Sequence, residues 1–427
     1  MTRLLTTAEV ARRLDVQTAT VYAYVSRGLL TNVGGRRASR FAQDEVERLV
    51  RRGREGRRPS GAIERINTAI TLLSDDGPAY RGRPVGELLG SSAEAVAHLL
   101  WTGALGPGEP FRASAELVDA AAGAAGALPP SARLVDRLRV AVAAASAVDP
   151  LRHDLDPAAV VRRAETILAL AVDVLAETTG SERGHPAAAQ SEQGHPAAAQ
   201  SERGHPAPAA VPGGTLAARL WPALAGRRAT PEQERLLNAV LIVLADHDLA
   251  VSTLAARVAA SARANPYAVV SAGLGALDGP QHGAASTLAH RFLAEALTDP
   301  VGALAERLRT GSPIPGFGHR VYRTRDPRTA LVLDLLGDGP VRAAVDAVAA
   351  PLAGRPDGFP NVDLALAAVV HAHDLRPDAG EAIFAVARTV GWIAHAVEEY
   401  AEPGLRFRAE GVYTGPVPDG RPNATLP

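Results

Sequence analysis

The stretch Ile314-Pro-Gly-Phe-Gly-His-Arg-Val-Tyr-Arg-Thr-Arg-Asp-Pro-Arg328 organises the interpretation of the whole chain. Two glycines flank its phenylalanine and lead into His319, so the backbone can approach a ligand closely there. Asp326 and the proline after it predict a helix N-cap that places Arg328 in the first turn. His319, Arg323 and Arg328 should then surround one concavity, which would suit a carboxylate-rich ligand and a proton transfer. The alternative is a basic surface loop with an incidental histidine.

The composition is that of a soluble globular protein with two or three domains. The chain has 427 residues, of which 47% are hydrophobic and 21% charged, with a formal net charge of -1. Aromatic residues are scarce, at 4%, and small aliphatic residues dominate, which favours helices packed through small side chains. The absence of cysteine excludes disulfides, thiolate catalysis and cysteine-ligated zinc. No signal peptide or membrane-spanning apolar run is evident, so we expect a cytoplasmic protein without membrane contact.

Residues 1–58 differ from the rest in pattern and charge. A capping box at Thr6 predicts a helix through Leu14, and a second helix is expected over Thr18–Arg27. Leu30–Phe41 contains two glycines between short runs, as a hairpin wing would, and a helix should restart over Asp44–Val50. This order resembles a winged helix-turn-helix of the mercury-resistance-regulator or excisionase type.

Arginines outnumber acidic residues in this N-terminal segment although the whole chain is close to neutral. The charge favours contact with DNA through residues 1–58, with Gln17–Tyr24 as the recognition helix. The alternative is a small docking domain that has lost DNA binding. Residues 52–60 read as a polar linker.

Helical periodicity dominates after residue 62, interrupted by a repeat. Helices are expected at Ala93–Trp101, within 110–178, at Thr215–Leu224, Pro231–Leu244, 284–297 and Ile383–Tyr400. Residues 181–210 contain a ten-residue unit three times, each with Gly-His-Pro. The three histidines could suggest metal binding, but glycine, proline and the lack of large apolar residues favour a disordered insertion.

Three further positions stand out as chemically interesting. His247 lies between two aspartates, which would favour its charged form, although a histidine at a helix C-cap is the alternative. His282 follows a glycine-rich loop at a predicted helix N-terminus, where the macrodipole would keep the ring neutral. Asp363 heads an apolar helix, either as an N-cap or as a carboxylate in a poorly solvating environment.

Taken together, these motifs closely resemble the citrate synthase family. The matching segments, in order, are Ala-Asp-His247, Gly-Pro-Gln-His282-Gly, Gly-Phe-Gly-His319-Arg-Val-Tyr, Pro-Asn-Val-Asp363, Ala387 to His395 and Tyr413-Thr-Gly415. Tyr80-Arg-Gly and Val96–Gly103 resemble the family's N-terminal signature. The resemblance covers about residues 62–427 apart from the repeat.

The resemblance implies condensation of acetyl-CoA, or another short acyl-CoA, with oxaloacetate, without a metal or a cofactor besides the coenzyme A thioester itself. By the match, the catalytic residues are Asp363 as base, His282 as donor to the thioester oxygen and His319 as acid at the ketone. The residues expected to bind oxaloacetate are His247, Arg328, Arg388 and Arg408. Those expected to bind coenzyme A are Pro315, Gly316, Phe317, Gly318 and Arg323.

The family also implies a mainly α architecture in which a small domain closes over a large one. After the winged helix-turn-helix domain (1–58), the large domain would comprise 59–283 and 369–427, with 181–210 as the disordered insertion. The small domain would span 284–368. A homodimer is expected, with Arg408 reaching into the partner's site.

Several positions depart from the family pattern. Ser286 stands where the family usually has asparagine, Leu364 replaces an aromatic residue after the base, Ala250 stands where asparagine is common, and Glu410 replaces an arginine. These changes put the acyl-chain preference in question more than the reaction class. Two alternatives to an acyltransferase remain: a DNA-binding regulator that senses oxaloacetate or an acyl-CoA, and a weakly active subunit of a hetero-oligomer.

Overall fold

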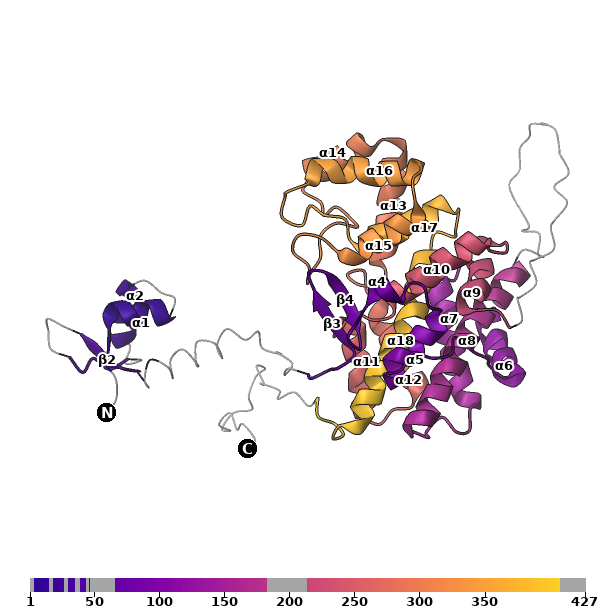
Figure 1. Ribbon diagram of the computed structural model, residues 1–427, viewed down its shortest axis with the longest axis horizontal. Helices are drawn as coiled ribbons and strands as arrows, with labels where there is room; N and C mark the ends of the chain where they lie inside the picture. The colour runs from indigo at the N-terminus through magenta and orange to yellow at the C-terminus, as the bar shows by residue number, and fades with distance from the viewer. Residues whose placement is uncertain are drawn as a thin grey trace, which may run out of the picture. The chain divides into compact units, whose positions relative to one another are not determined.

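The computed structural model describes residues 4–14, 18–26, 30–34, 39–43, 46, 66–182 and 213–407. The chain divides into two compact units, one of residues 1–66 with 407–427 and one of residues 67–406. Both are drawn in Figure 1.

The N-terminal unit contains two short helices and a two-stranded sheet. Helix α1 (Thr7–Leu14) and helix α2 (Thr18–Ser26) pack on each other, and strand β1 (Leu4–Thr6) pairs antiparallel with β2 (Arg40–Ala42). The capping box is confirmed, because Glu9 accepts a hydrogen bond from the Thr6 amide at 2.8 Å. The prediction of a hairpin wing was only partly right, because β2 pairs with β1, a strand that the sequence pattern did not indicate.

Part of the predicted N-terminal domain lies outside the described residues. This applies to residues 27–29 and 35–38 and to nearly all of the predicted helix at 44–50. Residues 51–65 lie outside the described residues as well, and most arginines of the expected basic surface fall in these four segments.

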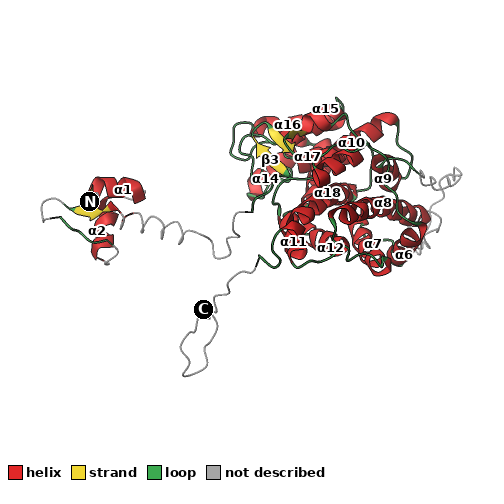
Figure 2. Cartoon of the chain, turned by 60° about the horizontal axis from the view of Figure 1, so that its bottom comes forward, coloured by secondary structure: helices red, strands yellow, loops and turns green. Residues whose placement is uncertain are grey.

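The larger unit is almost entirely helical, as predicted (Figure 2). Its elements are β3 (Thr71–Ser74), β4 (Gly77–Tyr80), β5 (Arg83–Pro84), α4 (Val85–Leu88), α5 (Ala93–Thr102), α6 (Ala115–Gly126), α7 (Leu134–Val148), α8 (Pro157–Glu182), α9 (Leu216–Ala225), α10 (Pro231–Leu244), α11 (Val251–Ser261), α12 (Pro266–Leu277), α13 (Ala285–Thr298), α14 (Pro300–Thr310), α15 (Pro327–Leu336), α16 (Pro340–Ala349), the 3₁₀ turn η1 (Ala350–Leu352), α17 (Val362–Ala372) and α18 (Ala379–Ala401).

Local signals set most helix boundaries. Thr230 caps α10 with a full capping box, and Ser92 caps α5, which ends at Gly103 in the left-handed conformation. Asp326 caps α15 as predicted, with Pro327 at the first helical position. Such a cap stabilises a helix by about 1 kcal/mol.

Two segments differ from expectation. The region around Tyr80, expected only to be rich in turns, forms the antiparallel sheet β3-β4-β5. Helix α8 continues through Ser181 and Glu182, so the first two residues of the predicted insertion are helical. The remainder of the insertion, 183–210, lies outside the described residues.

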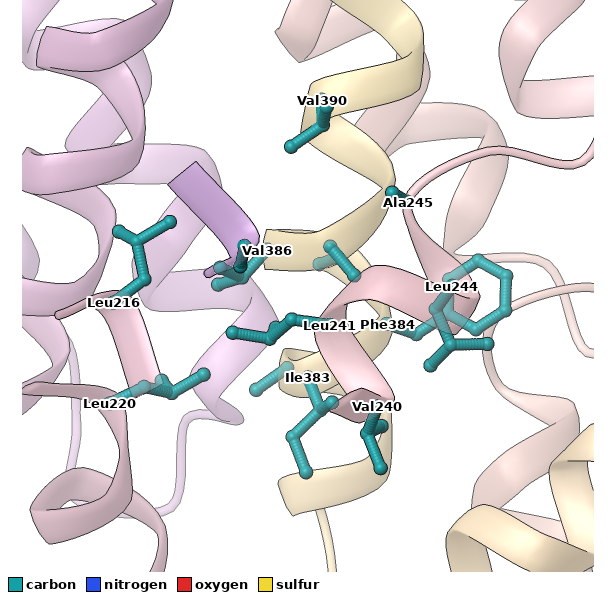
Figure 3. Close-up of a cluster of buried hydrophobic side chains, with 14 of the residues drawn as sticks. Leu216, Leu220, Val240, Leu241, Leu244, Ala245, Ile383, Phe384, Val386 and Val390 are labelled. Carbon is teal, nitrogen blue, oxygen red and sulfur yellow. The ribbon is translucent and has the colours of Figure 1, made fainter. Parts of the chain in front are cut away.

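Helix α18 is the centre of the core. It packs against α5, α7, α8, α10, α11, α12, α13 and α17. Leu241 of α10 and Ile383 of α18 lie close together in the apolar cluster between these helices, with Leu216 and Leu220 of α9 beside them (Figure 3). Burying each such side chain stabilises the fold by about 1.5–3 kcal/mol. Gly273 of α12 meets the ring of Trp392 so closely that a Cβ there would collide with it.

Helices α13 to α17 form a packed group after the glycine-rich segment at 279–284. α13 contacts α14, α16 and α17, and α15 contacts α10, α17 and β4. His282 and His319 lie in the segments before α13 and α15, and Asp363 lies in the first turn of α17. The division into a large and a small domain stays a prediction.

Candidate active site

The backbone of the central motif is fixed by two glycines in the left-handed region. Gly316 has φ 80° and Gly318 has φ 73°, and a Cβ at either position would collide with Leu364 or Asp357. Asn361 secures the loop from the other side: its amide donates to the Gly316 carbonyl and its side chain to the Gly318 carbonyl, each at 2.9 Å. The loop is therefore held against the start of α17.

The hydrogen bonds of His319 define its tautomer. Its Nδ1 accepts from the amides of Val321, at 3.0 Å, and Tyr322, at 3.2 Å. Burial, together with nearby Arg328, lowers the pKa of His319 to about 4. The ring is thus neutral at pH 7, and the two amide donors at Nδ1 place its proton on Nε2. Nη2 of Arg328 lies 3.2 Å from Nε2, but both atoms are donors in this tautomer, so they make no hydrogen bond and both face a ligand. The imidazole is ready to donate this proton to a ligand.

Arg328 lies buried beside this imidazole in a bidentate ion pair with Asp326. Its Nε and Nη2 contact the two carboxylate oxygens at 3.0 and 2.8 Å. Asp326 also accepts from the Val362 amide at 3.0 Å, and its pKa is lowered chiefly by Arg328 against the effect of burial. The sequence pattern indicated only a helix cap at Asp326, so this second role was not predicted.

His247 faces the same cluster. Its Nε2 lies 3.2 Å from the hydroxyl of Tyr322, and its ring centroid is 5.2 Å from that of His319. The expectation of a charged His247 was wrong, because burial, followed by Arg328 and Arg388, lowers its pKa well below the usual value. The preceding carboxylate, that of Asp246, turns away to Thr71 and does not offset this effect.

Arg388 presents an unused hydrogen-bond donor. It is buried in α18, its Nε donates to the Leu244 carbonyl at 2.9 Å, and its guanidinium lies 4.6 Å above the Phe384 ring. Its Nη2 is buried and has no hydrogen-bond partner in the described part of the chain. Burial lowers its pKa to about 10, so it remains charged at neutral pH. A buried cation with a free donor suits an anionic ligand.

Asp363 is the second residue of α17 and is not its cap. Asn361 caps the helix and accepts from the Asp363 amide at 3.0 Å. Within the described residues, no group donates a hydrogen bond to the Asp363 carboxylate, and burial raises its pKa to about 6. Of the two roles left open, the cap belongs to Asn361, and the raised pKa of Asp363 favours the poorly solvated carboxylate.

His282 lies in the turn before α13. Its Nε2 is 2.7 Å from Oγ of Ser252, which itself accepts a hydrogen bond from the Trp392 indole at 3.1 Å. Among the described residues, Nε2 is the acceptor that this hydroxyl contacts, so the serine donates to it and the ring proton lies on Nδ1. Burial, then Arg388, lowers the pKa of His282 to about 4, so the ring is neutral as predicted. Neither Ser252 nor Trp392 was identified from the sequence.

These groups converge from distant parts of the chain. The positive charges of Arg328 and Arg388 lower the pKa of both Asp363 and His247, and Arg388 also lowers the pKa of His282. The structure therefore places the three predicted catalytic residues and three of the four predicted oxaloacetate ligands around one polar centre. Arg408, the fourth, lies outside the described residues.

A cavity of about 570 Å³ opens beside this centre. Phe317, Gly318, His319 and Arg323 line it, so three of the five predicted coenzyme A residues meet a predicted catalytic histidine there. Pro315 and Gly316 do not line the cavity. A second cavity, of about 610 Å³, shares Arg323 and continues along Ala349 to Pro360. Together they offer room for an extended ligand.

Among the described residues, no cluster of three or more metal-ligating side chains occurs. None of the described helices combines the length and the apolarity needed to cross a bilayer.

Comparison with known proteins supplies the family. Residues 62–409 match the family described as "Citrate synthase, C-terminal domain", and residues 4–54 match "Helix-turn-helix domain". Citrate synthase of Acidithiobacillus ferridurans is 34% identical over 213 residues, which cover 47% of this chain and 55% of the relative. Citrate synthase 2 of Bacillus subtilis is 33% identical over 202 residues, covering 45% and 54%. The chain thus spans about half the length of the curated relatives it matches.

Solved structures agree on the fold. Citrate synthase from Thermotoga maritima superposes with a TM-score of 0.66 at 24% identity, covering 85% of this chain and 96% of that chain. The enzyme from Pyrobaculum aerophilum gives 0.65 at 26% identity, covering 83% and 91%. With the family match extending over most of its length, this chain belongs to the citrate synthase family.

Proposed function

We propose that the protein condenses a short acyl-CoA, acetyl-CoA in the simplest case, with oxaloacetate and water, and releases citrate (or its homologue) and coenzyme A. The observation that carries this proposal is Asp363: a carboxylate to which no described residue donates a hydrogen bond, with a pKa near 6, in one site with two neutral imidazoles and two buried arginines. This combination suits removal of a proton from a weakly acidic carbon.

In the first step, Asp363 takes a proton from the carbon next to the thioester carbonyl. Its poor solvation makes the ionised form a stronger base than an exposed aspartate. The developing negative charge on the thioester oxygen needs a donor, and Nδ1–H of His282 supplies one because Ser252 occupies Nε2. A neutral donor matches a weakly basic enol better than a charged imidazolium would.

In the second step, the enol carbon attacks the ketone carbon of oxaloacetate and forms a carbon–carbon bond. Nε2–H of His319 donates its proton to the ketone oxygen, which becomes the hydroxyl of the product. The free Nη2 of Arg388 and the paired guanidinium of Arg328 bind the two carboxylates, with His247 beside them. Water then hydrolyses the thioester and releases coenzyme A.

Two comparisons support these substrates. The structure of a Thermoplasma acidophilum citrate synthase, which has the same fold, is a ternary complex with carboxymethyl coenzyme A and oxaloacetate. The curated relatives are citrate synthases as well. These matches favour an acyltransferase over a metabolite-sensing regulator without turnover.

The test is a thiol-release assay with acetyl-, propionyl- and butyryl-CoA, each with and without oxaloacetate. We expect coenzyme A release that requires oxaloacetate and is lost in Asp363→Ala. If no acyl-CoA is consumed above background, the enzymatic proposal fails. The ranking of the three donors will report how Leu364, beside the base, shapes the acyl pocket.

We further propose a homodimer in which Arg408 completes the partner's oxaloacetate site. Sedimentation analysis tests the dimer. Mixing an Asp363→Ala protein with an Arg408→Ala protein tests the shared site, because hybrid dimers should regain one intact site and part of the activity.

DNA binding through residues 1–58 is the remaining proposal, supported by the helix-turn-helix match and the arginine content of this segment. Fluorescence anisotropy with duplex DNA at two salt concentrations tests it. Binding that weakens steeply with salt and is lost on deletion of residues 1–58 is expected. Equal anisotropy with and without the segment would refute it.

A further inference from the structure

A buried carboxylate lies close to the free arginine of the proposed oxaloacetate site. Asp246 is fully buried, and its Oδ2 accepts from Oγ1 of Thr71 at 2.6 Å and from the Asp248 amide at 3.0 Å. Its Oδ1 faces Nε2 of His395 at 3.4 Å without the geometry of a hydrogen bond, and within the described residues neither atom has a hydrogen-bond partner. The proposed mechanism does not use this carboxylate.

Asp246 and Arg388 interact electrostatically without forming an ion pair. Asp246 partly offsets the effect of burial on the pKa of Arg388, and Arg388 contributes to the lowered pKa of Asp246. In the described part of the chain, the Arg388 nitrogens and the Asp246 oxygens are more than 4.0 Å apart and form no ion pair. A carboxylate at this position is a natural competitor for the guanidinium, because a buried ion pair would satisfy both groups. Other groups must therefore hold the Asp246 carboxylate away from Arg388.

The imidazole of His395 is fixed in an orientation that keeps the Asp246 carboxylate away from Arg388. Its Nδ1 accepts from Nη1 of Arg257 at 2.7 Å, so the proton of the neutral ring lies on Nε2 and faces Asp246. Arg257 is itself held by Glu399 at 3.0 Å and by Glu398 at 2.9 Å. All of this network except Glu398 is buried, so the imidazole has little freedom to turn.

The end of α18 extends the network toward the C-terminal segment. Arg406 donates to both oxygens of Glu399, at 2.6 and 2.7 Å. Gly391, one turn before His395, lies so close to Asp246 that a Cβ there would overlap the carboxylate. The glycine lets α18 approach the turn that bears His247, and this close approach brings His395 next to Asp246.

We propose that His395 is a positioning residue which, together with Thr71, holds the Asp246 carboxylate off Arg388 and so keeps that guanidinium free for a carboxylate of the substrate. This inference rests on the proposed function. It assigns to Arg257, Glu399 and Arg406 the role of fixing the orientation of the imidazole.

Titration calorimetry with oxaloacetate and steady-state kinetics of the full-length protein test this role. His395→Leu removes the donor that faces Asp246, so the carboxylate should pair with Arg388. Losing one charge-assisted contact to the substrate should raise Kd and KM for oxaloacetate by about 10- to 100-fold. KM for the acyl-CoA should change little, because the thioester binds elsewhere. His395→Gln, which retains an N–H, should lose less affinity.

The decisive measurement is suppression by a second substitution. Asp246→Asn removes the competing charge, while the amide oxygen can still accept from Thr71 and from the Asp248 amide. Combined with His395→Leu, it should restore most of the lost oxaloacetate affinity. A purely structural defect would instead grow worse when a second buried group is changed.

Thr71→Val is a second test in case His395→Leu does not fold. It removes the hydrogen bond from Thr71 to Asp246 and should also weaken oxaloacetate binding. Unchanged oxaloacetate affinity in the folded variants, or no recovery with Asp246→Asn, would overturn the role of His395. If the wild-type protein neither binds oxaloacetate nor releases coenzyme A, the proposed function fails first and this inference falls with it.

Discussion

Replacing Asp363 by asparagine should inactivate the protein and stabilise it at the same time. The two side chains have nearly the same shape, so the change removes only the ionisable group. Burial raises the pKa of this carboxyl from 3.8 to about 6, which means that the folded state disfavours the ionised form. Its favourable contribution to stability is therefore complete below pH 3.8 and is lost as the pH rises through 6.

The expected magnitude follows from that shift. About two pKa units correspond to about 3 kcal/mol of destabilisation of the ionised wild type at pH 8. The asparagine amide leaves its N–H donors without a partner, which costs about 1 kcal/mol. The net gain in the free energy of unfolding should thus be about 2 kcal/mol at pH 8 and should disappear toward pH 4. Turnover should fall about 10²- to 10⁴-fold, as for loss of a general base.

Urea unfolding at pH 4 and pH 8, paired with the thiol-release assay, measures both effects. Asp326→Asn is the matched control, because that carboxylate has a lowered pKa and a bidentate partner in Arg328. The control should lose about 3–5 kcal/mol at pH 8. A variant at position 363 that is less stable than wild type at pH 8, or that retains most of its turnover, would refute the reasoning.

Three further outcomes are expected. The value of kcat/KM for the acyl-CoA should fall tenfold per pH unit below about pH 6, because Asp363 becomes protonated there. No second group of the site should titrate between pH 6 and 8, since His282 is already neutral in that range. A pH profile centred above pH 7 would contradict this. Ser252→Ala should lower kcat about 10-fold and leave KM for oxaloacetate unchanged, because it removes only the hydrogen bond that sets the tautomer of His282. A change in KM for oxaloacetate with an unchanged kcat would argue against this role. Asn361→Ala should lower the free energy of unfolding by about 1–2 kcal/mol through loss of the helix cap, which chemical denaturation can check, while unchanged stability would contradict the assigned cap.

Local sequence patterns predicted most elements of the larger unit. The helix over Pro231–Leu244 has the predicted bounds, and Asp326 caps α15, because caps, prolines and apolar periodicity act within a few residues. The same patterns missed the sheet around Tyr80, whose strands are too short to give a clear alternation, and placed the start of α18 four residues late. Arg408 and the repeat insertion beyond Glu182 remain predictions.

By itself the sequence determined which groups could do the chemistry: three histidines, an aspartate and several arginines in recognisable local settings, on a chain whose periodicity is helical. Only the tertiary structure decided their protonation states and partners. His247 was expected to be charged from its two neighbouring aspartates, yet it is neutral, because burial and two arginines brought from α15 and α18 outweigh a carboxylate that turns away. Asp326 became the partner of Arg328, and Ser252 that of His282, through packing of helices distant in sequence. Desolvation and charge act through space, so their balance at a site is set by what the fold brings together and not by adjacency along the chain.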